Sequence, residues 1–246
     1  MHTHPLPQPG PAPKTLVEAA YLQLRRDIIS GRRAPGEKLR VEHLKDEYQV
    51  GAGTLREALA LLVADALVVT QGQRGFRVTS MSLSDFEDIT RTRVLLETQA
   101  LRNAIEHGDD AWEADLVASF HQLTKAEERL GEHHGAWVDE WEARNREFHE
   151  ALIAASPSRW IRHFLAVLYR QSERYRRLAV TARPIPRDLH AEHTAIFQAT
   201  LGRNAELACQ LLAEHILLTL KSIRELPVET MSSTDLQTPG GGATAA

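Results

Sequence analysis

Three histidines and one asparagine are the residues whose types and spacing point most directly to chemistry. Asn145 and His149 are four residues apart, so on a helix their side chains would share one face. His193 and His215 stand before and after a break at Gly202. If the flanking segments form an antiparallel helical hairpin, a rise of about 1.5 Å per residue brings the two imidazoles to within roughly 3 Å of the same height. The four side chains could therefore converge on one point.

Such a cluster has the chemistry of a divalent metal site. Imidazole nitrogens and one hard oxygen suit zinc first, with nickel, iron or manganese as alternatives, and so few protein ligands leave coordination positions open. The helical stripe of Asn145 also carries Trp137, Trp141 and Leu152, so this face is expected to be buried. The alternative is three unrelated histidines bonded to carboxylates such as Glu192 and Glu214, because no compact motif such as His-Glu-x-x-His is present.

The ligand candidates lie in a long helical region. From Ser82 onward every long segment spaces its apolar residues at helical periodicity, which predicts roughly six helices and an independent bundle over residues 80–226. Breaks in the pattern fall near residues 108–109, 131–135, 156–157, 183–186 and 202. The proline-rich segment 1–14 and the segment 227–246, which lacks apolar periodicity, are predicted to be disordered tails.

A separate unit precedes the bundle. Helical periodicity runs from Leu16 to Ile28, and shorter helices are expected over about 41–48 and 54–64. Two β-rich runs around a turn at 71–75 predict a hairpin. Three helices followed by a two-stranded wing, over residues 15–79, are the layout of a winged helix-turn-helix. The predicted fold class is therefore mainly α, with an N-terminal winged helix-turn-helix followed by an all-α bundle.

The residues of this unit that could contact nucleic acid lie in the turn, the third helix and the wing. Gly51 is expected to supply the backbone freedom that the tight turn needs. Arg56, one turn into the third helix, would lie within reach of guanine or phosphate. Gln73 and Arg74, beside Gly75 at the tip of the wing, could enter an adjacent minor groove.

Charge permits such a role without requiring it. The chain has 29 Lys and Arg against 33 Asp and Glu, a net charge of −4, which excludes a uniformly basic coat. Residues 15–80 hold 10 basic against 8 acidic residues, or +2, whereas residues 81–226 hold 18 against 23, or −5. Only the N-terminal unit is therefore suited to approach a polyanion. The alternative is a packed domain for protein contacts, with Arg56 paired to Glu57 or Asp46.

Composition also indicates where the protein is expected to work. A single cysteine, Cys209, cannot form an intramolecular disulfide and favours a reducing compartment. No apolar run approaches the roughly 18 residues needed to cross a bilayer. The first residues have neither the basic start nor the apolar core of a signal peptide. We expect a cytoplasmic protein with no membrane association.

The N-terminal unit resembles the GntR superfamily of bacterial transcription regulators over residues 15–79. The matching segments are Pro35-Gly-Glu-Lys-Leu39, Val50-Gly-Ala-Gly-Thr-Leu-Arg-Glu-Ala-Leu59, Asp65-Ala-Leu-Val68 and Arg74-Gly-Phe-Arg-Val78. The resemblance implies a homodimer that binds a pseudo-palindromic double-stranded DNA operator, with Arg56 at the DNA.

Two departures from the family pattern shift the expected contacts. The family often carries a Ser-Arg-Thr sequence where this chain has Gly51-Ala52-Gly53, and an arginine where this chain has Glu42. We therefore expect Arg40, Thr54, Arg56 and the wing to carry more of the contact. The backbone of residues 51–53 is expected to approach the DNA closely.

The C-terminal region resembles the FadR-type effector domain, called the FCD domain, in its metal-binding form. The resemblance covers about residues 82–225 and rests on Asn145-Arg-Glu-Phe-His149, Glu192-His193 and Glu214-His215-Ile216. It implies a bundle of six or seven helices with Asn145, His149, His193 and His215 as metal ligands. Because all four ligands are neutral, the ion would keep its full charge and favour an anionic effector, a small carboxylate.

Four further residues are candidates for contacting the effector. Arg93 matches a recurrent arginine of this effector family, and a guanidinium can clamp a carboxylate, although an ion pair with Glu97 four residues later is an equal alternative. Arg146, Tyr175 and Arg176 are weaker candidates, because the cluster around Arg176 could instead be a solvated face or a dimer contact.

The sequence thus predicts a DNA-binding transcription regulator, a repressor, whose operator affinity responds to a small organic acid at a metal site in the bundle. It is not expected to be an enzyme. The alternatives are a metal-dependent hydrolase that activates water at the open coordination position, and a regulator that responds to the metal alone.

Overall fold

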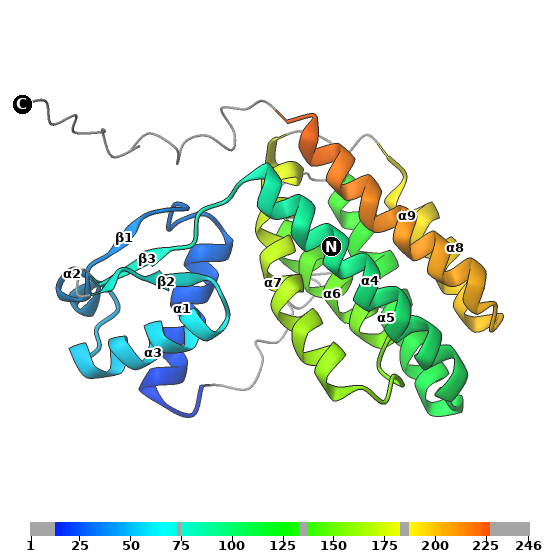
Figure 1. Ribbon diagram of the computed structural model, residues 1–246, viewed down its shortest axis with the longest axis horizontal. Helices are drawn as coiled ribbons and strands as arrows, with labels where there is room; N and C mark the ends of the chain where they lie inside the picture. Colours follow the sequence, from blue (N-terminus) through cyan, green and yellow to red (C-terminus); the bar gives the residue numbers. More distant parts are fainter. Residues whose placement is uncertain (1–12, 73–74, 133–136, 183–186, 227–246) are drawn as a thin grey trace, which may run out of the picture. The chain divides into compact units, whose positions relative to one another are not determined.

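A computed structural model describes residues 13–72, 75–132, 137–182 and 187–226, so all but Pro13 and Lys14 of the two predicted tails lie outside the described residues. The chain divides into two compact units, with the boundary between Thr79 and Ser80 (Figure 1). Helices dominate both units, and the only sheet among the described residues belongs to the first.

The first unit is a winged helix-turn-helix. Its elements are α1 (Leu16–Ile29), β1 (Lys38–Leu39), α2 (Val41–Glu47), α3 (Ala52–Ala64), β2 (Val68–Thr70) and β3 (Phe76–Val78). The Thr15 side chain caps α1 by accepting a hydrogen bond from the backbone amide of Glu18. The core between α1 and α3 is built on fully buried leucines, Leu24 from α1 with Leu55, Leu59 and Leu62 from α3.

The wing is a three-stranded antiparallel sheet in the order β1-β3-β2. The predicted hairpin is confirmed, with Val68 opposite Val78 and Thr70 opposite Phe76. Sequence reading missed the third strand, β1, in which Lys38 pairs with Arg77. Two residues are too few for the alternation of apolar and polar side chains that marks a strand.

The turn between α2 and α3 corrects the expectation for Gly51. Gly51 has ordinary extended backbone angles, φ −66° and ψ 152°, and it is Gln49 that takes the left-handed conformation, with φ 53°. The backbone amide of Val50 donates to the carbonyl of Lys45, the hydrogen bond of a Schellman helix end. The turn therefore depends on Gln49, and the fold does not demand a glycine at position 51.

The second unit is a bundle with six helices among its described residues. They are α4 (Leu83–His107), α5 (Asp110–Glu132), α6 (Val138–Leu152), α7 (Arg159–Ala182), α8 (Leu189–Leu201) and α9 (Ala205–Arg224). Side chains of Ser82, Asp188 and Asn204 cap the starts of α4, α8 and α9. These helices agree with the prediction of an all-α bundle of six or seven.

Packing within the bundle brings α8 and α9 together as an antiparallel hairpin, with α4 alongside α9 (Figure 1). Helix α5 packs on α6, and α7 contacts both α4 and α9. The main core includes Trp112, Leu116, Phe148 and Leu212, and a smaller cluster forms where Phe86 stacks on Tyr175. None of the described helices is both long and apolar enough to cross a membrane.

Candidate metal centre and candidate nucleic-acid interface

The three histidines meet in the interior of the bundle. His149 comes from α6, His193 from α8 and His215 from α9, and each offers one ligand atom within 4.8 Å of the others. Their rings are 0 to 7% exposed. Asn145 lies one turn before His149 on the buried face of α6. The hairpin of α8 and α9 thus places His193 and His215 side by side, with ring centroids 4.6 Å apart.

A carboxylate stands behind each imidazole. Glu127 Oε1 is 2.5 Å from His193 Nδ1, and Glu192 Oε2 is 2.8 Å from His215 Nδ1. Glu97 Oε2 is 3.6 Å from His149 Nδ1, which is longer than a hydrogen bond. In His193 and His215, Nδ1 is bonded to a carboxylate, so Nε2 is the nitrogen that remains for a ligand. This is the arrangement by which proteins orient histidines that bind metals.

Two atoms of the cluster need partners that the described protein groups do not supply. The Nε2 atom of His193 and the Nδ1 atom of His149 are buried and, among the described residues, have no hydrogen-bond partner. A buried unsatisfied polar atom costs about 1–3 kcal/mol. A divalent cation bound by one nitrogen of each imidazole would give the Nε2 atom of His193 a partner, so the residues present fit a metal ion.

Burial keeps two of the imidazoles in the form that binds metals. Burial lowers the pKa of His149 to about 4, although the neighbouring Glu97 opposes the shift. Burial, together with the two other histidines, lowers the pKa of His215 well below its ordinary value. Both rings are therefore neutral at pH 7, and neutral imidazole is the metal-binding form.

Glu97 links the cluster to α4 and α7. Its carboxylate pairs with Arg93 Nε at 2.6 Å and accepts a hydrogen bond from the Tyr169 hydroxyl at 2.7 Å. Burial alone would raise the pKa of Glu97, but Arg93 and His149 outweigh it and lower the pKa to about 2. Glu97 is thus an anion that joins three helices at the histidine centre.

The carboxylates change the charge expected from the ligands alone. As ligands, an amide and three imidazoles bring no negative charge, but Glu97, Glu127 and Glu192 surround the cluster. Arginines offset two of these charges, Arg93 at Glu97 and Arg187 at Glu192, 3.3 Å away. A divalent ion would therefore keep an excess of about one positive charge and would still favour an anion.

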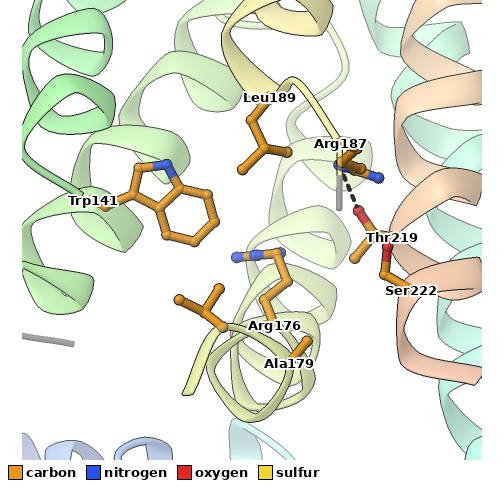
Figure 2. A pocket seen from close by; sticks show the side chains of 8 residues that line it. Trp141, Arg176, Ala179, Arg187, Leu189, Thr219 and Ser222 are labelled. Carbon is orange, nitrogen blue, oxygen red and sulfur yellow. Dashed lines mark hydrogen bonds between the residues drawn. The ribbon is translucent and has the colours of Figure 1, made fainter. Parts of the chain in front are cut away.

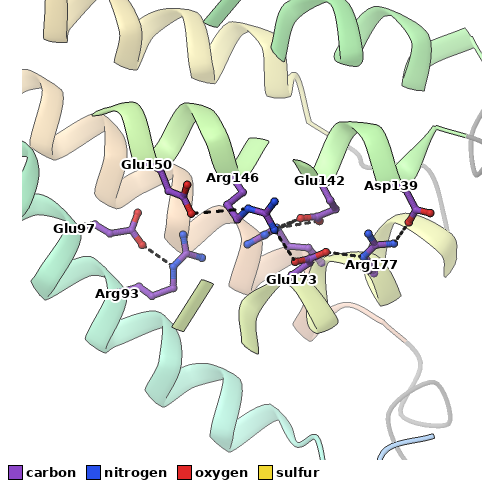
Figure 3. A network of polar contacts seen from close by, with 9 residues as sticks. Arg93, Glu97, Asp139, Glu142, Arg146, Glu150, Glu173 and Arg177 are labelled. Carbon is purple, nitrogen blue, oxygen red and sulfur yellow. Dashed lines mark hydrogen bonds and ion pairs between the residues drawn. The ribbon is translucent and has the colours of Figure 1, made fainter. Parts of the chain in front are cut away.

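The four residues proposed to contact an effector already make polar contacts within the bundle. Figure 3 shows Arg93 beside Glu97, and Arg146 between Glu150 and Glu173. Arg93 pairs with Glu97, the alternative already open from the sequence. Arg176 is buried and makes a two-pronged ion pair with Glu142, at 3.1 and 2.7 Å. Both Arg93 and Arg176 therefore already have buried carboxylate partners within the bundle.

The other two candidates, Arg146 and Tyr175, differ in how far their side chains are exposed. Arg146 is one-third exposed and lies 3.9 and 4.0 Å from Glu150 and Glu173. The Tyr175 hydroxyl donates to Asp85 at 2.8 Å, and the ring packs in the smaller core cluster. Tyr175 thus holds the start of α4, whereas Arg146 is the most exposed of the four side chains.

Glu127 is the functional candidate that sequence reading missed. It lies four residues after Leu123 and three before Leu130, both buried, so it falls on the apolar stripe of α5. A charge within such a stripe is a signal that could have found it. His190 also contacts Glu127 from the rim, at 2.8 Å.

The second candidate site is the start of α3 in the first unit. Gly51 is the N-cap of α3 and makes no side-chain capping bond, so the first backbone amides of the helix point outward. A Cβ atom added at Gly51 or Gly53 would meet no atom within 4 Å. Nothing in the fold requires glycine here, but an outside backbone or phosphate could approach closely.

Cationic side chains flank this helix start. Arg40 and Arg56 are exposed, and Thr54 is half-buried. Within the described ranges Arg56 forms no ion pair with Glu57 or Asp46, the partners considered from sequence. Of the predicted wing contacts, Gly75 is in the left-handed region with φ 93°, and Gln73 and Arg74 lie outside the described residues.

Comparison with protein families gives two matches that together cover most of the chain. The family described as bacterial regulatory proteins, gntR family, matches residues 16–78. The FCD domain matches residues 88–218. The first match contains the winged helix-turn-helix, and the second contains all four predicted metal ligands.

Curated relatives carry the same description. The chain is 46% identical over 212 residues to an uncharacterized HTH-type transcriptional regulator, BphR, of Paraburkholderia xenovorans (strain LB400), covering 86% of each chain. It is 36% identical to the HTH-type transcriptional repressor GlaR of Escherichia coli (strain K12), covering 83% of this chain and 94% of GlaR. Both relatives are described as regulators of transcription and neither as an enzyme.

Solved structures share the fold at low sequence identity. E. coli McbR/YncC aligns with a TM-score of 0.70 at 20% identity, over 86% of this chain and 98% of that one. A putative GntR transcriptional regulator from Rhodococcus sp. RHA1 aligns with a TM-score of 0.68, also at 20% identity, over 85% and 97%.

Proposed function

The chain belongs to the GntR family of bacterial transcription regulators and carries an FCD domain, and from this premise we propose that it is a repressor whose operator affinity is set by a metal ion and a small carboxylate. The protein would bind a pseudo-palindromic operator as a homodimer, with one recognition helix, α3, in each half-site. The observation that carries the proposal is the cluster of three buried histidines, each backed by a carboxylate, in the same chain as a DNA-reading unit.

The proposed metal ligands are Asn145, His149, His193 and His215. Zinc suits three imidazoles and an amide oxygen, and nickel, iron or manganese are alternatives. A bound ion would act as a Lewis acid that accepts an oxygen of the effector. The neutral imidazoles of His149 and His215 and the unpaired Nε2 atom of His193 support this site.

The effector is proposed to be a small carboxylate that completes the coordination sphere. The residual positive charge around the ion favours an anion, and the one-third exposed Arg146 could guide it. Because Arg93 and Arg176 are already paired, they would orient the site rather than clamp the ligand. Tyr175 would act at a distance, by holding the start of α4.

DNA contact is proposed at the start of α3 and in the wing. Arg56, Arg40 and Thr54 would contact phosphates or base edges, and the backbone of Gly51, Ala52 and Gly53 would lie close to the DNA. The residues of the wing that we propose to contact DNA are Gln73, Arg74 and Gly75. Helix α4 follows the DNA-reading unit directly in sequence and carries Arg93 and Glu97. Because Glu97 contacts His149, a displacement of His149 on ligand binding could be transmitted through α4 toward the boundary between the two units in the sequence.

A second candidate function is a regulator that responds to the metal alone. The orphaned Nε2 of His193 favours it, since the ion by itself would satisfy that atom. The hydrolase considered from the sequence is not retained, because the matched families and relatives are regulators of transcription.

Fluorescence anisotropy with the intergenic DNA that flanks the gene tests the proposal. The zinc-loaded protein should prefer this duplex to a scrambled one by at least about a thousandfold at near-physiological salt. A carboxylic acid from a panel of two to six carbons should weaken binding by about 5- to 150-fold. An effect of chelator alone, with no response to any acid, would favour the metal-only function. No preference for the flanking duplex under any condition would refute both.

A further inference from the structure

The stretch of chain that leads into α3 has no buried apolar anchor. Leu44 of α2 and Leu55 of α3 are 3% and 0% exposed, but none of the ten residues between them, 45–54, is buried. Tyr48 and Val50 pack only partly against the core. The stretch contains the turn and the first residues of α3, at which the DNA contact is proposed. Apolar burial alone therefore holds it weakly.

The hydroxyl of Tyr48 ties the end of α2 to α1. Tyr48 is the C-cap of α2 and directly precedes the left-handed Gln49. Its hydroxyl donates to Asp27 Oδ2 at 2.6 Å. Asp27 is 3% exposed, and its other oxygen pairs with Arg32 at 3.1 Å. Burial, together with the bond to Asp27, raises the pKa of Tyr48 to about 12, so the hydroxyl remains a donor at neutral pH.

Arg33 adds a second tie from the loop between α1 and β1. Its Nε donates to the Tyr48 hydroxyl at 3.4 Å, and its other nitrogens pair with Glu37, at 3.0 Å, and with Glu47. The backbone amide of Arg33 donates to the carbonyl of Asp27 at 2.8 Å, so α1 fixes the arginine as well. A planar guanidinium suits a residue that holds three groups at once. The turn network consists of Asp27, Arg33, Glu47 and Tyr48.

Polar bonds of the bundle differ from the turn network, because buried apolar side chains lie beside them. Arg187 donates to the Thr219 hydroxyl at 3.2 Å, and the same small space is lined by Leu189 and by Trp141, which is 2% exposed (Figure 2). Apolar contacts would keep these helices in place if the polar bond were removed. The stretch 45–54 has no buried side chain to take over, so its position depends more strongly on its polar bonds.

We infer that the turn network positions the start of α3 on the operator and thereby sets how well the protein distinguishes its operator from other DNA. The inference rests on the proposed DNA interface. Tyr48 acts through Asp27 and Arg33, so it is a positioning residue rather than a DNA contact. Reading base edges requires that α3 lies in the groove at a fixed position, whereas binding to random DNA depends on the number of cationic charges.

Tyr48→Phe in the zinc-loaded full chain tests the inference, because it removes the hydroxyl, keeps the ring and changes no charge. Fluorescence anisotropy measures the affinity for the duplex that flanks the gene and for its scrambled version. We expect binding to the flanking duplex to weaken about three- to tenfold, as for the loss of one hydrogen bond. Binding to the scrambled duplex should stay at the wild-type value, because no cation is lost.

Tyr21→Phe is the matched control. The Tyr21 hydroxyl also ties α1 to an aspartate, but this partner is Asp65, the C-cap at the far end of α3. The melting temperature of both variants should fall by a few degrees, because each aspartate loses a donor. Only Tyr48→Phe should lose preference for the flanking duplex, since a merely structural role would lower stability and leave the ratio of the two affinities unchanged.

Arg33→Lys tests the same network without touching the tyrosine. It keeps the positive charge, but an ammonium lacks the planar fork that holds three groups, so the preference for the flanking duplex should again fall. Arg26→Lys is its control, because Arg26 is exposed on α1 and outside the turn network. This substitution should leave both affinities unchanged.

Two results would overturn the inference while leaving the proposed function intact. One is a wild-type preference for the flanking duplex in Tyr48→Phe and Arg33→Lys. The other is an equal loss of preference in Tyr21→Phe, which would make the loss a consequence of stability. If the wild-type protein itself does not prefer the flanking duplex, the proposed function fails and the inference falls with it.

Discussion

The two candidate sites are built in opposite ways. The metal centre gathers buried side chains from helices far apart in the sequence, with Glu127 on α5, His149 on α6 and His215 on α9. The nucleic-acid interface lies on one short stretch, from Arg40 to Arg56, and its cationic side chains are exposed. The buried site depends on the tertiary fold of the whole bundle, whereas the exposed site depends on local sequence and one turn.

This difference has an energetic consequence. Each group of the buried centre is held by its neighbours, so a substitution there affects ligand binding and stability together. Arg56 has no ion-pair partner among the described residues, so its loss should affect binding alone. Substitutions matched between the two sites can therefore test the contrast.

The largest effect is expected from His193→Ala. Loss of one of three imidazole ligands should weaken zinc binding by more than about a hundredfold, and the thermal stabilisation by zinc should fall accordingly. Calorimetry and melting temperatures with and without zinc measure both. His190→Ala is the control, because His190 lies on the same helix and also contacts Glu127 but is 51% exposed. Equal losses of zinc affinity in His193→Ala and His190→Ala would show that the loss does not depend on the burial of the histidine.

Glu127→Gln should have the next largest effect. The carboxylate orients His193 through Nδ1, and removing such a partner lowers metal affinity by about 10- to 100-fold. The neighbouring Glu128→Gln is the control, since Glu128 is exposed and its ion-pair partner is Lys125, at 3.0 Å. Zinc titration would contradict the role of Glu127 if both variants bound zinc as the wild type does.

At the nucleic-acid interface, Arg56→Ala should weaken binding to the operator duplex by about tenfold, because one good contact contributes about 1–3 kcal/mol to the binding free energy. Zinc affinity and melting temperature should stay at their wild-type values, which is the opposite of His193→Ala. Arg102→Ala, which removes one positive charge from the surface of the bundle, is the control. A loss of stability in Arg56→Ala would show that this arginine is structural.

Asn145→Asp adds one negative charge to the proposed ligand set. It should strengthen zinc binding and weaken acetate binding to the zinc-loaded protein by about tenfold, because the ion loses its residual positive charge. Asn103→Asp places the same charge elsewhere on the bundle, where Asn103 bonds to Gln99, and should change neither. Unchanged acetate affinity in Asn145→Asp would mean that position 145 does not set the charge of the site.

Sequence reading predicted what local patterns encode and missed what depends on distant partners. The hairpin and the helices were predictable because periodicity and glycine breaks are local, and the meeting of His193 with His215 followed from counting residues along a hairpin. The contact of Glu127 with His193 was not predictable by counting, because α5 and α8 do not follow one another in the chain and so form no hairpin. The left-handed Gln49 was missed because a glycine two residues later offered the easier explanation.

Gly53→Ala carries the smallest expected effects, and they have opposite signs for stability and for binding. Alanine is a better helix former than glycine, and a Cβ at this position meets open space, so the free energy of unfolding should rise by up to about 1 kcal/mol. The same methyl group would stand between the helix start and an approaching phosphate and should weaken operator binding a few-fold. Chemical denaturation and anisotropy measure the two quantities.

Ala60→Gly is the matched control for this last substitution, since Ala60 is exposed on the same helix but two turns further along. It should lower stability by about the same amount and leave operator binding unchanged. A Gly53→Ala variant with unaltered operator affinity would mean that the DNA does not approach the backbone at the start of α3. A gain in stability together with a loss of binding would instead show that the exposed site keeps a residue that the fold itself does not favour, as the buried centre does with the unpaired Nε2 of His193.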